Sequence, residues 1–366
     1  MSKIISIGTA VPEYATQQSV ILDFMHAAYH DVTASRKLNI LFHNSGINTR
    51  HSVVPDFNNG KSEHNFFGSD KPVPDVEKRL SIYKANAASL AIDAIHHSVE
   101  NLKTTVAAFG ITHLITVSCT GIYAPGLGTE IMEQLGLPND IFTTSINYMG
   151  CNAAFPALRI ADMIARAEVD AKVMVVCVEL CTIHFQPKDN NDNLLSNTIF
   201  GDGAAAVVVV SDEAARQNHQ RGLTINGFYS LLLGNGKDLM GWNITPVNFE
   251  MILDPGIPAF ISDEVIEILR KAEKKLNMVA SSVSKWAIHP GGKSILDAVK
   301  KRIPLKEDDL QYSYNVLAKY GNMSSPTILF VLNEMLESGL RPDEKVFSIG
   351  FGPGISIETA LFTYDG

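Results

Sequence analysis

The stretch Ser145-Ile-Asn-Tyr-Met-Gly-Cys-Asn-Ala-Ala-Phe-Pro-Ala-Leu-Arg159 changes from a strand-like pattern to a helical one. This change is the starting point for interpreting the rest of the chain. A strand-like apolar run ends at Gly150 and a helical pattern begins after it, so Cys151 lies at the turn. Such a turn lifts a side chain out of a sheet, and a helix N-terminus favours a thiolate. Cys151 is therefore a candidate nucleophile, and the alternative is a small buried hydrophobic residue.

Two later segments supply partners for a thiol. Trp286-Ala-Ile-His-Pro-Gly-Gly-Lys293 places His289 at the end of a short strand, before glycines that allow a ligand close to the backbone. Tyr320-Gly-Asn-Met-Ser-Ser325 places Asn322 just before a helical pattern, where an asparagine is often only a helix cap. Together, a thiol, a base and a second hydrogen-bond donor form the set that acyl transfer needs.

Five motifs in this order resemble the type III polyketide synthases, the chalcone-synthase-like family of the thiolase superfamily, and most closely its bacterial members. The resemblance runs from Ile4 to the C-terminus and rests on Gly150-Cys151-Asn152, Phe200-Gly-Asp-Gly-Ala-Ala-Ala206, His289-Pro290-Gly291-Gly292, Gly321-Asn322-Met323-Ser324-Ser325 and Gly350-Phe-Gly-Pro-Gly354. It implies that Cys151 holds the starter acyl group, while His289 and Asn322 stabilise the enolate that malonyl-CoA forms on losing CO₂. It also implies an acyl-CoA starter, a homodimer, and neither a metal nor any other cofactor.

Alternating helical and strand patterns predict an α/β fold. The resemblance implies a thiolase-like fold, in which two duplicated βαβαβαββ halves form a five-layered αβαβα core. We place the halves at residues 1–212, with Cys151, and 213–366, with His289 and Asn322. A strand-like run beginning at Tyr314 is the predicted counterpart of the strand before Cys151. The polar stretch 186–193 is predicted to be an exposed loop, with a lid near the site as the alternative.

Further site residues follow from the resemblance. Phe200 and Phe249 match the gatekeeper phenylalanines of the family, although most phenylalanines are simply core residues. Cavity positions are predicted at Cys181, His184, Ala124, Ser324, Gly352 and Pro353. Ala124 stands where plant members carry a methionine that reaches into the partner subunit. Its shorter side chain predicts an open apolar channel and a long acyl starter.

The predicted CoA-binding residues are Lys37, Gly291, Gly292 and Ser294. Plant members hold the CoA phosphates with three basic residues on an early helix, and only Lys37 matches one of them. Arg36, Arg50 and Lys293 are candidates to compensate. A weaker grip on CoA leaves an acyl carrier protein as an alternative carrier of the starter.

Composition narrows the class of protein. A formal net charge of −9 over 366 residues argues against nucleic acid as a partner. No segment approaches the roughly 20 apolar residues of a membrane span, and the first residues do not resemble a signal peptide. Four cysteines without a zinc-binding pattern fit the reducing cytoplasm.

The sequence thus predicts a cytoplasmic, iterative polyketide synthase that makes an alkylpyrone or alkylresorcinol-type product. Two alternatives stay open. One is a ketoacyl synthase III-like enzyme that performs a single condensation, and the other is a thiolase-fold scaffold that performs none.

Overall fold

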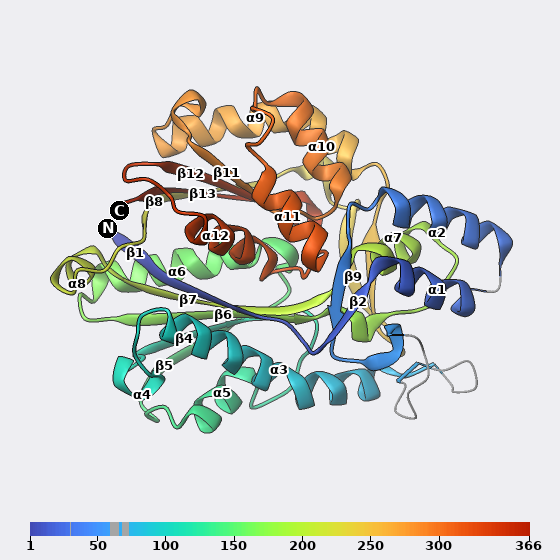
Figure 1. Cartoon of the computed structure of the whole chain (residues 1–366), viewed down its shortest axis with the longest axis horizontal. Coiled ribbons are helices and arrows are strands. Elements are labelled where there is room, and N and C mark those ends of the chain that lie inside the picture. Colours follow the sequence, from blue (N-terminus) through green and yellow to red (C-terminus); the bar gives the residue numbers. More distant parts are fainter. Residues whose placement is uncertain (30, 59–65, 68–72) are drawn as a thin grey trace.

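Five stacked layers of secondary structure form the body of the molecule (Figure 1). The structure is a computed structural model and describes residues 1–29, 31–58, 66–67 and 73–366. Helices α3 (Val76–Glu100) and α5 (Leu127–Leu135) cover one outer face, and α9 (Ile257–Leu276) and α10 (Lys293–Arg302) cover the other. Helices α6 (Ala154–Ala167) and α12 (Thr327–Glu337) lie in the middle, between two layers of strands.

The strands of both layers join in one sheet, which has nine strands within the described residues. Its order is β5 (Phe142–Ile146), β4 (His113–Val117), β6 (Lys172–Leu180), β7 (Asp202–Ser211), β1 (Ser2–Ala10), β8 (Leu223–Leu232), β13 (Ser356–Tyr364), β12 (Lys345–Gly352) and β11 (Lys285–Ile288). Strand β1 pairs antiparallel with β7 and, through its first residues, with β8. The two halves of the chain are therefore held together by backbone hydrogen bonds as well as by packing.

The central layer of helices holds the turns at Cys151 and Asn322 in place. Helix α6 buries Ala157, Ala161 and Ala165, small residues that let it pack closely between the strands. Helix α12 is buried over most of its length. Burial of each large apolar side chain stabilises a fold by about 1.5–3 kcal/mol. Because α6 begins just after Cys151 and α12 just after Asn322, this packing fixes both turns.

The predicted duplication has one exception. The first half follows the predicted order of strands and helices, but residues 311–320 of the second half form helix α11 (Gln311–Tyr320) rather than a strand. Tyr312, Val316 and Leu317 are buried at helical spacing, which the alternating pattern expected of a strand does not match. The prediction of a strand from Tyr314 is wrong, and the turn at Asn322 lies between two helices.

A smaller group of elements covers the end of the sheet that lies nearest to the turns at Cys151 and Asn322 (Figure 1). It comprises α1 (Gln18–Ala28), α2 (Val32–Asn44), β2 (Tyr14–Gln17), β3 (Thr49–Ser52), α7 (Asn191–Ile199), β9 (Met240–Ile244) and β10 (Phe249–Leu253). The sequence predicted an exposed loop at 186–193, and residues 187–191 are exposed as predicted, whereas Gln186 and Asn193 are buried and α7 begins within this stretch. The short helices α4 (Val106–Phe109) and α8 (Asp212–Gln217) lie away from this region.

Gly8 is required for the contact between β1 and α3. A Cβ atom at Gly8 would lie 2.1 Å from the backbone nitrogen of Ser98 and 2.4 Å from the carbonyl oxygen of Ala94. Backbone atoms of a buried helix cannot give way as a flexible side chain would, so we expect Gly8→Ala to lower the free energy of unfolding by about 3 kcal/mol. Urea unfolding checks this, with Gly234→Ala as control because no heavy atom lies within 4 Å of that position. Equal stability of the two variants would contradict the contact.

Among the described residues, no helix combines the length and the apolar composition that crossing a bilayer requires.

Candidate active site

Cys151 lies in a tight turn, the 3₁₀ helix η2 (Gly150–Asn152), between β5 and α6. The Asn152 side chain anchors this turn to the second half by donating to the carbonyl oxygen of Ser356 at 3.0 Å and to its Oγ at 2.9 Å. A Cβ atom at Gly352 would lie 2.5 Å from the same amide. Gly352 therefore shapes the support beneath the nucleophile and lines neither cavity described below.

Asn322 faces Cys151 from the loop between α11 and α12. Its Nδ2 donates to Cys151 Sγ at 3.9 Å and to the carbonyl oxygen of Gly291 at 3.3 Å. Its Oδ1 accepts the Ser324 backbone N–H at 2.8 Å, a contact within the loop. Asn322 does not cap α12, whose N-cap residue is Pro326. The oxygen therefore holds the loop, while the amide nitrogen faces Cys151.

His289 ends strand β11, and its backbone N–H donates to Ile349 of β12 at 2.9 Å. The imidazole is buried at 1% exposure, and neither ring nitrogen has a hydrogen-bond partner within the described ranges. Burial lowers the pKa of His289 to about 3, because the charged form has lost water and gained no partner. The ring is neutral at physiological pH.

Burial also has the largest effect on the pKa of the Cys151 thiol. It raises the pKa of Cys151 to about 11, against smaller lowering effects of hydrogen bonds from Ser324 and Asn322. The sequence predicted a lowered pKa from the helix N-terminus, and for the thiol by itself that expectation is wrong. A thiolate in this site requires a base that takes up the thiol proton, and His289, which is neutral in the resting site, lines the same cavity.

Two cavities meet at Cys151 within the part of the chain that the structure describes. The outer cavity, of about 560 Å³, is lined by Cys151, His289, Asn322 and the four residues predicted to bind CoA, which are Lys37, Gly291, Gly292 and Ser294. The inner cavity, of about 90 Å³, is lined among others by Cys119, Cys181, His184, Ser324 and Pro353. Cys151, Phe200, Met240 and Met251 line both, so Phe200 stands at the junction where a gatekeeper is predicted. Ala124 lines neither cavity of the single chain.

Phe249 is buried and lines the inner cavity, as predicted for the second gatekeeper. Its ring stacks on His184 with centroids 4.6 Å apart and on Trp242 at 5.2 Å. His184 Nδ1 accepts the Phe249 backbone N–H at 3.2 Å, and its Nε2 faces the Thr120 carbonyl oxygen at 2.7 Å. Burial lowers the pKa of His184 to about 4, so the neutral ring holds strand β10 against the cavity.

The three residues considered as additional CoA ligands, Lys293, Arg50 and Arg36, lie in three different environments. Lys293 lines the outer cavity beside Lys37, but Lys293 pairs with Asp297 at 2.6 Å and Lys37 with Asp189 at 3.9 Å. Arg50 is buried, donates to Gln18 Oε1 and to the Phe200 carbonyl oxygen, and lines the inner cavity. Its predicted role in CoA binding is wrong, because its guanidinium group lies inside the fold. Arg36 lines neither cavity.

Sequence reasoning missed Glu179, the buried residue next to the end of β6. Its carboxylate accepts the backbone N–H groups of Cys119 and Thr120 and the hydroxyl of Ser325. Burial raises its pKa. Glu179 therefore joins the loop after β4 to the loop that carries Asn322, across the two halves. The only sequence signal was a single acidic residue at the end of the apolar run 173–178.

Comparisons with known proteins agree with this geometry. The family model for the N-terminal domain of chalcone and stilbene synthases matches residues 1–213, and the model for their C-terminal domain matches residues 229–364. "Alpha-pyrone synthesis polyketide synthase-like Pks18" of Mycobacterium tuberculosis is 28% identical over 97% of this chain and 89% of that protein. The "3,5-dihydroxyphenylacetyl-CoA synthase" of Streptomyces toyocaensis is 28% identical over 98% of this chain and 89% of that protein.

A solved structure extends the likeness to the whole fold. PKS-I of the brown alga Ectocarpus siliculosus superimposes with a TM-score of 0.92 at 27% identity, over 99% of this chain and 98% of that one. The predicted thiolase-like α/β fold is confirmed. This chain belongs to the chalcone and stilbene synthase family and is a type III polyketide synthase, an acyltransferase that forms carbon–carbon bonds by Claisen condensation.

Proposed function

We propose that the enzyme extends an acyl thioester starter iteratively with malonyl-CoA and closes the chain to an alkylpyrone or alkylresorcinol-type product. The observation that carries this proposal is that Cys151, His289 and Asn322 line one cavity, with Phe200 at its junction to a second. The name of the Mycobacterium tuberculosis relative, which refers to α-pyrone synthesis, supports a pyrone.

In the proposed mechanism His289 accepts the thiol proton while the Cys151 sulfur attacks the starter thioester. The bond from the acyl carbon to the carrier sulfur breaks, and the carrier leaves as a thiol with the proton that His289 returns. Malonyl-CoA then binds in the outer cavity, where His289 and Asn322 Nδ2 donate hydrogen bonds to its thioester oxygen. These donors stabilise the enolate that forms as CO₂ leaves. The enolate attacks the acyl group on Cys151, which leaves as a thiolate, so that the lengthened chain is a thioester of CoA. Transfer of this chain back to Cys151, with release of CoA, starts the next cycle, and the chain extends into the inner cavity. CoA thioesters are substrates in this scheme, and it needs no metal and no other cofactor.

An acyl carrier protein is a second candidate carrier of the starter. Both lysines at the outer cavity are already paired with carboxylates, Lys37 with Asp189 and Lys293 with Asp297. CoA phosphates would have to compete for these cations, whereas a carrier-bound pantetheine arm brings fewer phosphates to the cavity. Parallel reactions with acyl-CoA and acyl carrier protein distinguish the two carriers.

Product analysis tests the function. We expect purified protein, given malonyl-CoA and a series of acyl thioesters from short to long and aromatic, to release pyrones or resorcinols detectable by mass spectrometry. Products that stop after one malonyl unit would favour the single-condensation alternative. Absence of product with every starter, carrier-bound starters included, would favour a scaffold.

Reactivity of the thiol should depend on His289. The pKa of about 11 applies to the thiol beside a neutral imidazole, so the thiolate forms readily only if His289 takes up the thiol proton as the reagent reacts. We therefore expect His289→Ala to slow alkylation of Cys151 by iodoacetamide at pH 7 by tenfold or more. The sign follows from the raised pKa: the variant reacts only through free thiolate, which gains tenfold per pH unit up to about pH 10, whereas alkylation assisted by His289 as a base depends less steeply on pH. Peptide mass mapping of Cys151 over pH 5–10 measures both profiles, and identical profiles would contradict the pairing.

We also propose that the enzyme is a homodimer. Strand β5 lies at the edge of the sheet, and the exposed side chains on it and in the residues after it include Phe142, Tyr148 and Met149. An open strand edge next to apolar side chains is typically covered by a partner. Light scattering coupled to size exclusion should give twice the 39.9 kDa of one chain.

A cytoplasmic location is proposed from the four free cysteines.

A further inference from the structure

Helix α7 forms a wall between the two cavities and presents a different face to each. Leu194, Leu195, Thr198 and Ile199 line the outer cavity, whereas Asn193, Ser196 and Asn197 line the inner cavity. The three polar residues are buried and recur at helical spacing, so they share one face of the helix. Burying amides costs free energy unless they find partners, so a buried polar face needs an explanation.

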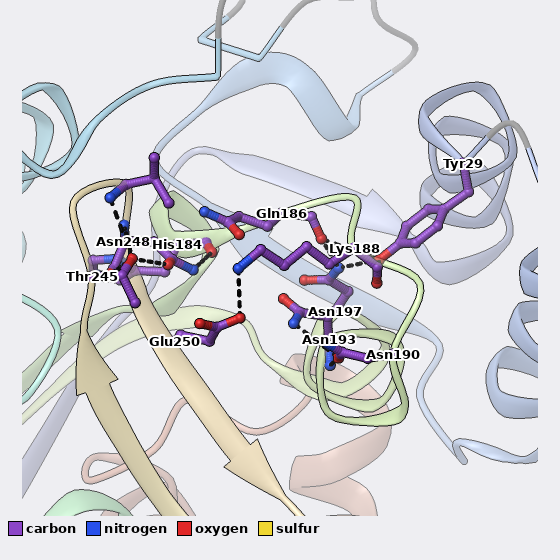
Figure 2. Close-up of polar contacts among 11 residues, drawn as sticks. Tyr29, His184, Gln186, Lys188, Asn190, Asn193, Asn197, Thr245, Asn248 and Glu250 are labelled. Atoms are coloured by element: carbon purple, nitrogen blue, oxygen red, sulfur yellow. Dashed lines mark hydrogen bonds and ion pairs between the residues drawn. The ribbon is translucent and has the colours of Figure 1, made fainter.

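Neighbouring groups fix how the two amides are oriented (Figure 2). Asn197 Nδ2 donates to the carbonyl oxygen of Gln186 at 2.8 Å and to the hydroxyl of Tyr29 at 2.9 Å. Asn193 Nδ2 donates to Asn190 Oδ1 at 3.0 Å, and that oxygen also accepts the Asn193 backbone N–H. The backbone partners admit only this assignment of nitrogen and oxygen in each amide.

Both N–H groups of the Asn197 amide and one of the two of the Asn193 amide are thus used, and the acceptors are not. Neither Asn193 Oδ1 nor Asn197 Oδ1 accepts a hydrogen bond from any described residue. Two carbonyl oxygens held on one wall of a cavity match a ligand group that donates hydrogen bonds. The carbonyl groups of a growing polyketide only accept hydrogen bonds, so they do not satisfy these oxygens.

We propose that the inner cavity selects an acyl starter that carries a hydroxyl group, and that Asn193 and Asn197 bind this hydroxyl through their side-chain oxygens. This inference rests on the proposed function, because the acyl chain must reach the inner cavity from Cys151. A volume of about 90 Å³ suits a short chain, since one water needs roughly 10–15 Å³ of such space. The starter class is therefore a short hydroxyacyl thioester.

The experiment compares matched pairs of acyl-CoA starters of about four to ten carbons, each with and without a terminal hydroxyl group. We measure kcat/KM for product formation with malonyl-CoA, and the Kd of each starter on Cys151→Ala protein by calorimetry. Wild type should prefer the hydroxylated member by about 5- to 10-fold at the best chain length, the value of one neutral hydrogen bond. Asn197→Leu and Asn193→Leu should each reduce this ratio to one or below.

Two controls separate recognition from loss of structure. Tyr29→Phe removes one partner of the Asn197 amide but leaves Gln186 in place, so the preference should persist. Asn218→Leu makes the same substitution after α8, far from the cavities, and should also keep it. A ratio of one at every length in wild type, or an unchanged ratio in both leucine variants, would overturn the inference. If no starter gives product, the proposed function fails, and the Kd ratio alone decides the inference.

Discussion

Cys151→Ala should abolish product formation while the protein keeps its ability to decarboxylate malonyl-CoA. The substitution removes the atom that carries the acyl chain, and loss of a catalytic nucleophile costs on the order of 10⁶ in rate. His289 and Asn322 remain in the outer cavity, where they are proposed to stabilise the enolate. Intact-protein mass spectrometry should therefore show an acyl adduct on wild type and none on the variant, while CO₂ release from malonyl-CoA continues in both.

Cys177→Ala is the matched control for this prediction. Cys177 is buried in β6 and lines neither cavity, so its variant should still gain the acyl mass. An adduct on Cys151→Ala would mean that another thiol, such as Cys119 or Cys181 in the inner cavity, is the nucleophile. Loss of decarboxylation together with condensation would show that the two steps are not divided between residues as proposed.

Much of the site could be predicted because its residues follow regular elements. Cys151 and His289 each follow a strand-like run in the sequence, and the structure places His289 directly after β11. Cys151 lies in η2, because β5 ends at Ile146, earlier than the strand-like run predicted. Glycines near them indicate places where the backbone approaches a neighbour, as Gly150 approaches Pro353. Local pattern and motif therefore located both turns, and the order of the elements gave the fold class.

Features that depend on long-range burial could not be predicted. Arg50 reads as a surface cation in the sequence, yet it is buried beside Phe200 because β3 packs over β7. The stretch 186–193 reads as an exposed loop, which holds for residues 187–191, yet the backbone carbonyl of the buried Gln186 accepts hydrogen bonds from Tyr29 and Asn197. Composition reports the polarity of a segment, and only the tertiary structure shows whether those polar groups find partners inside.

Asn322→Asp should slow decarboxylation of malonyl-CoA by on the order of 10²–10³, the usual cost of losing one oxyanion donor. The aspartate keeps an oxygen that can accept the Ser324 N–H, so the loop after α11 remains in place. It loses the Nδ2 donor that faces Cys151 and, when ionised, brings negative charge to the place where the enolate forms. Acyl loading of Cys151 should be much less affected than decarboxylation.

The pH dependence of this variant identifies the cause of the loss. Burial raises the pKa of a carboxyl group, and the protonated form has an O–H that can donate in place of the amide. Decarboxylation by Asn322→Asp should therefore recover in part as pH falls from 8 to 5.5, relative to wild type.

Asn218→Asp, after α8 at the far side of the molecule, makes the same substitution outside the site and should follow the wild-type profile. Stopped-flow measurement of CO₂ release and mass spectrometry of the acyl-enzyme give the two readouts. If acyl loading and decarboxylation fall together at every pH, Asn322 supports the fold of the site rather than the enolate.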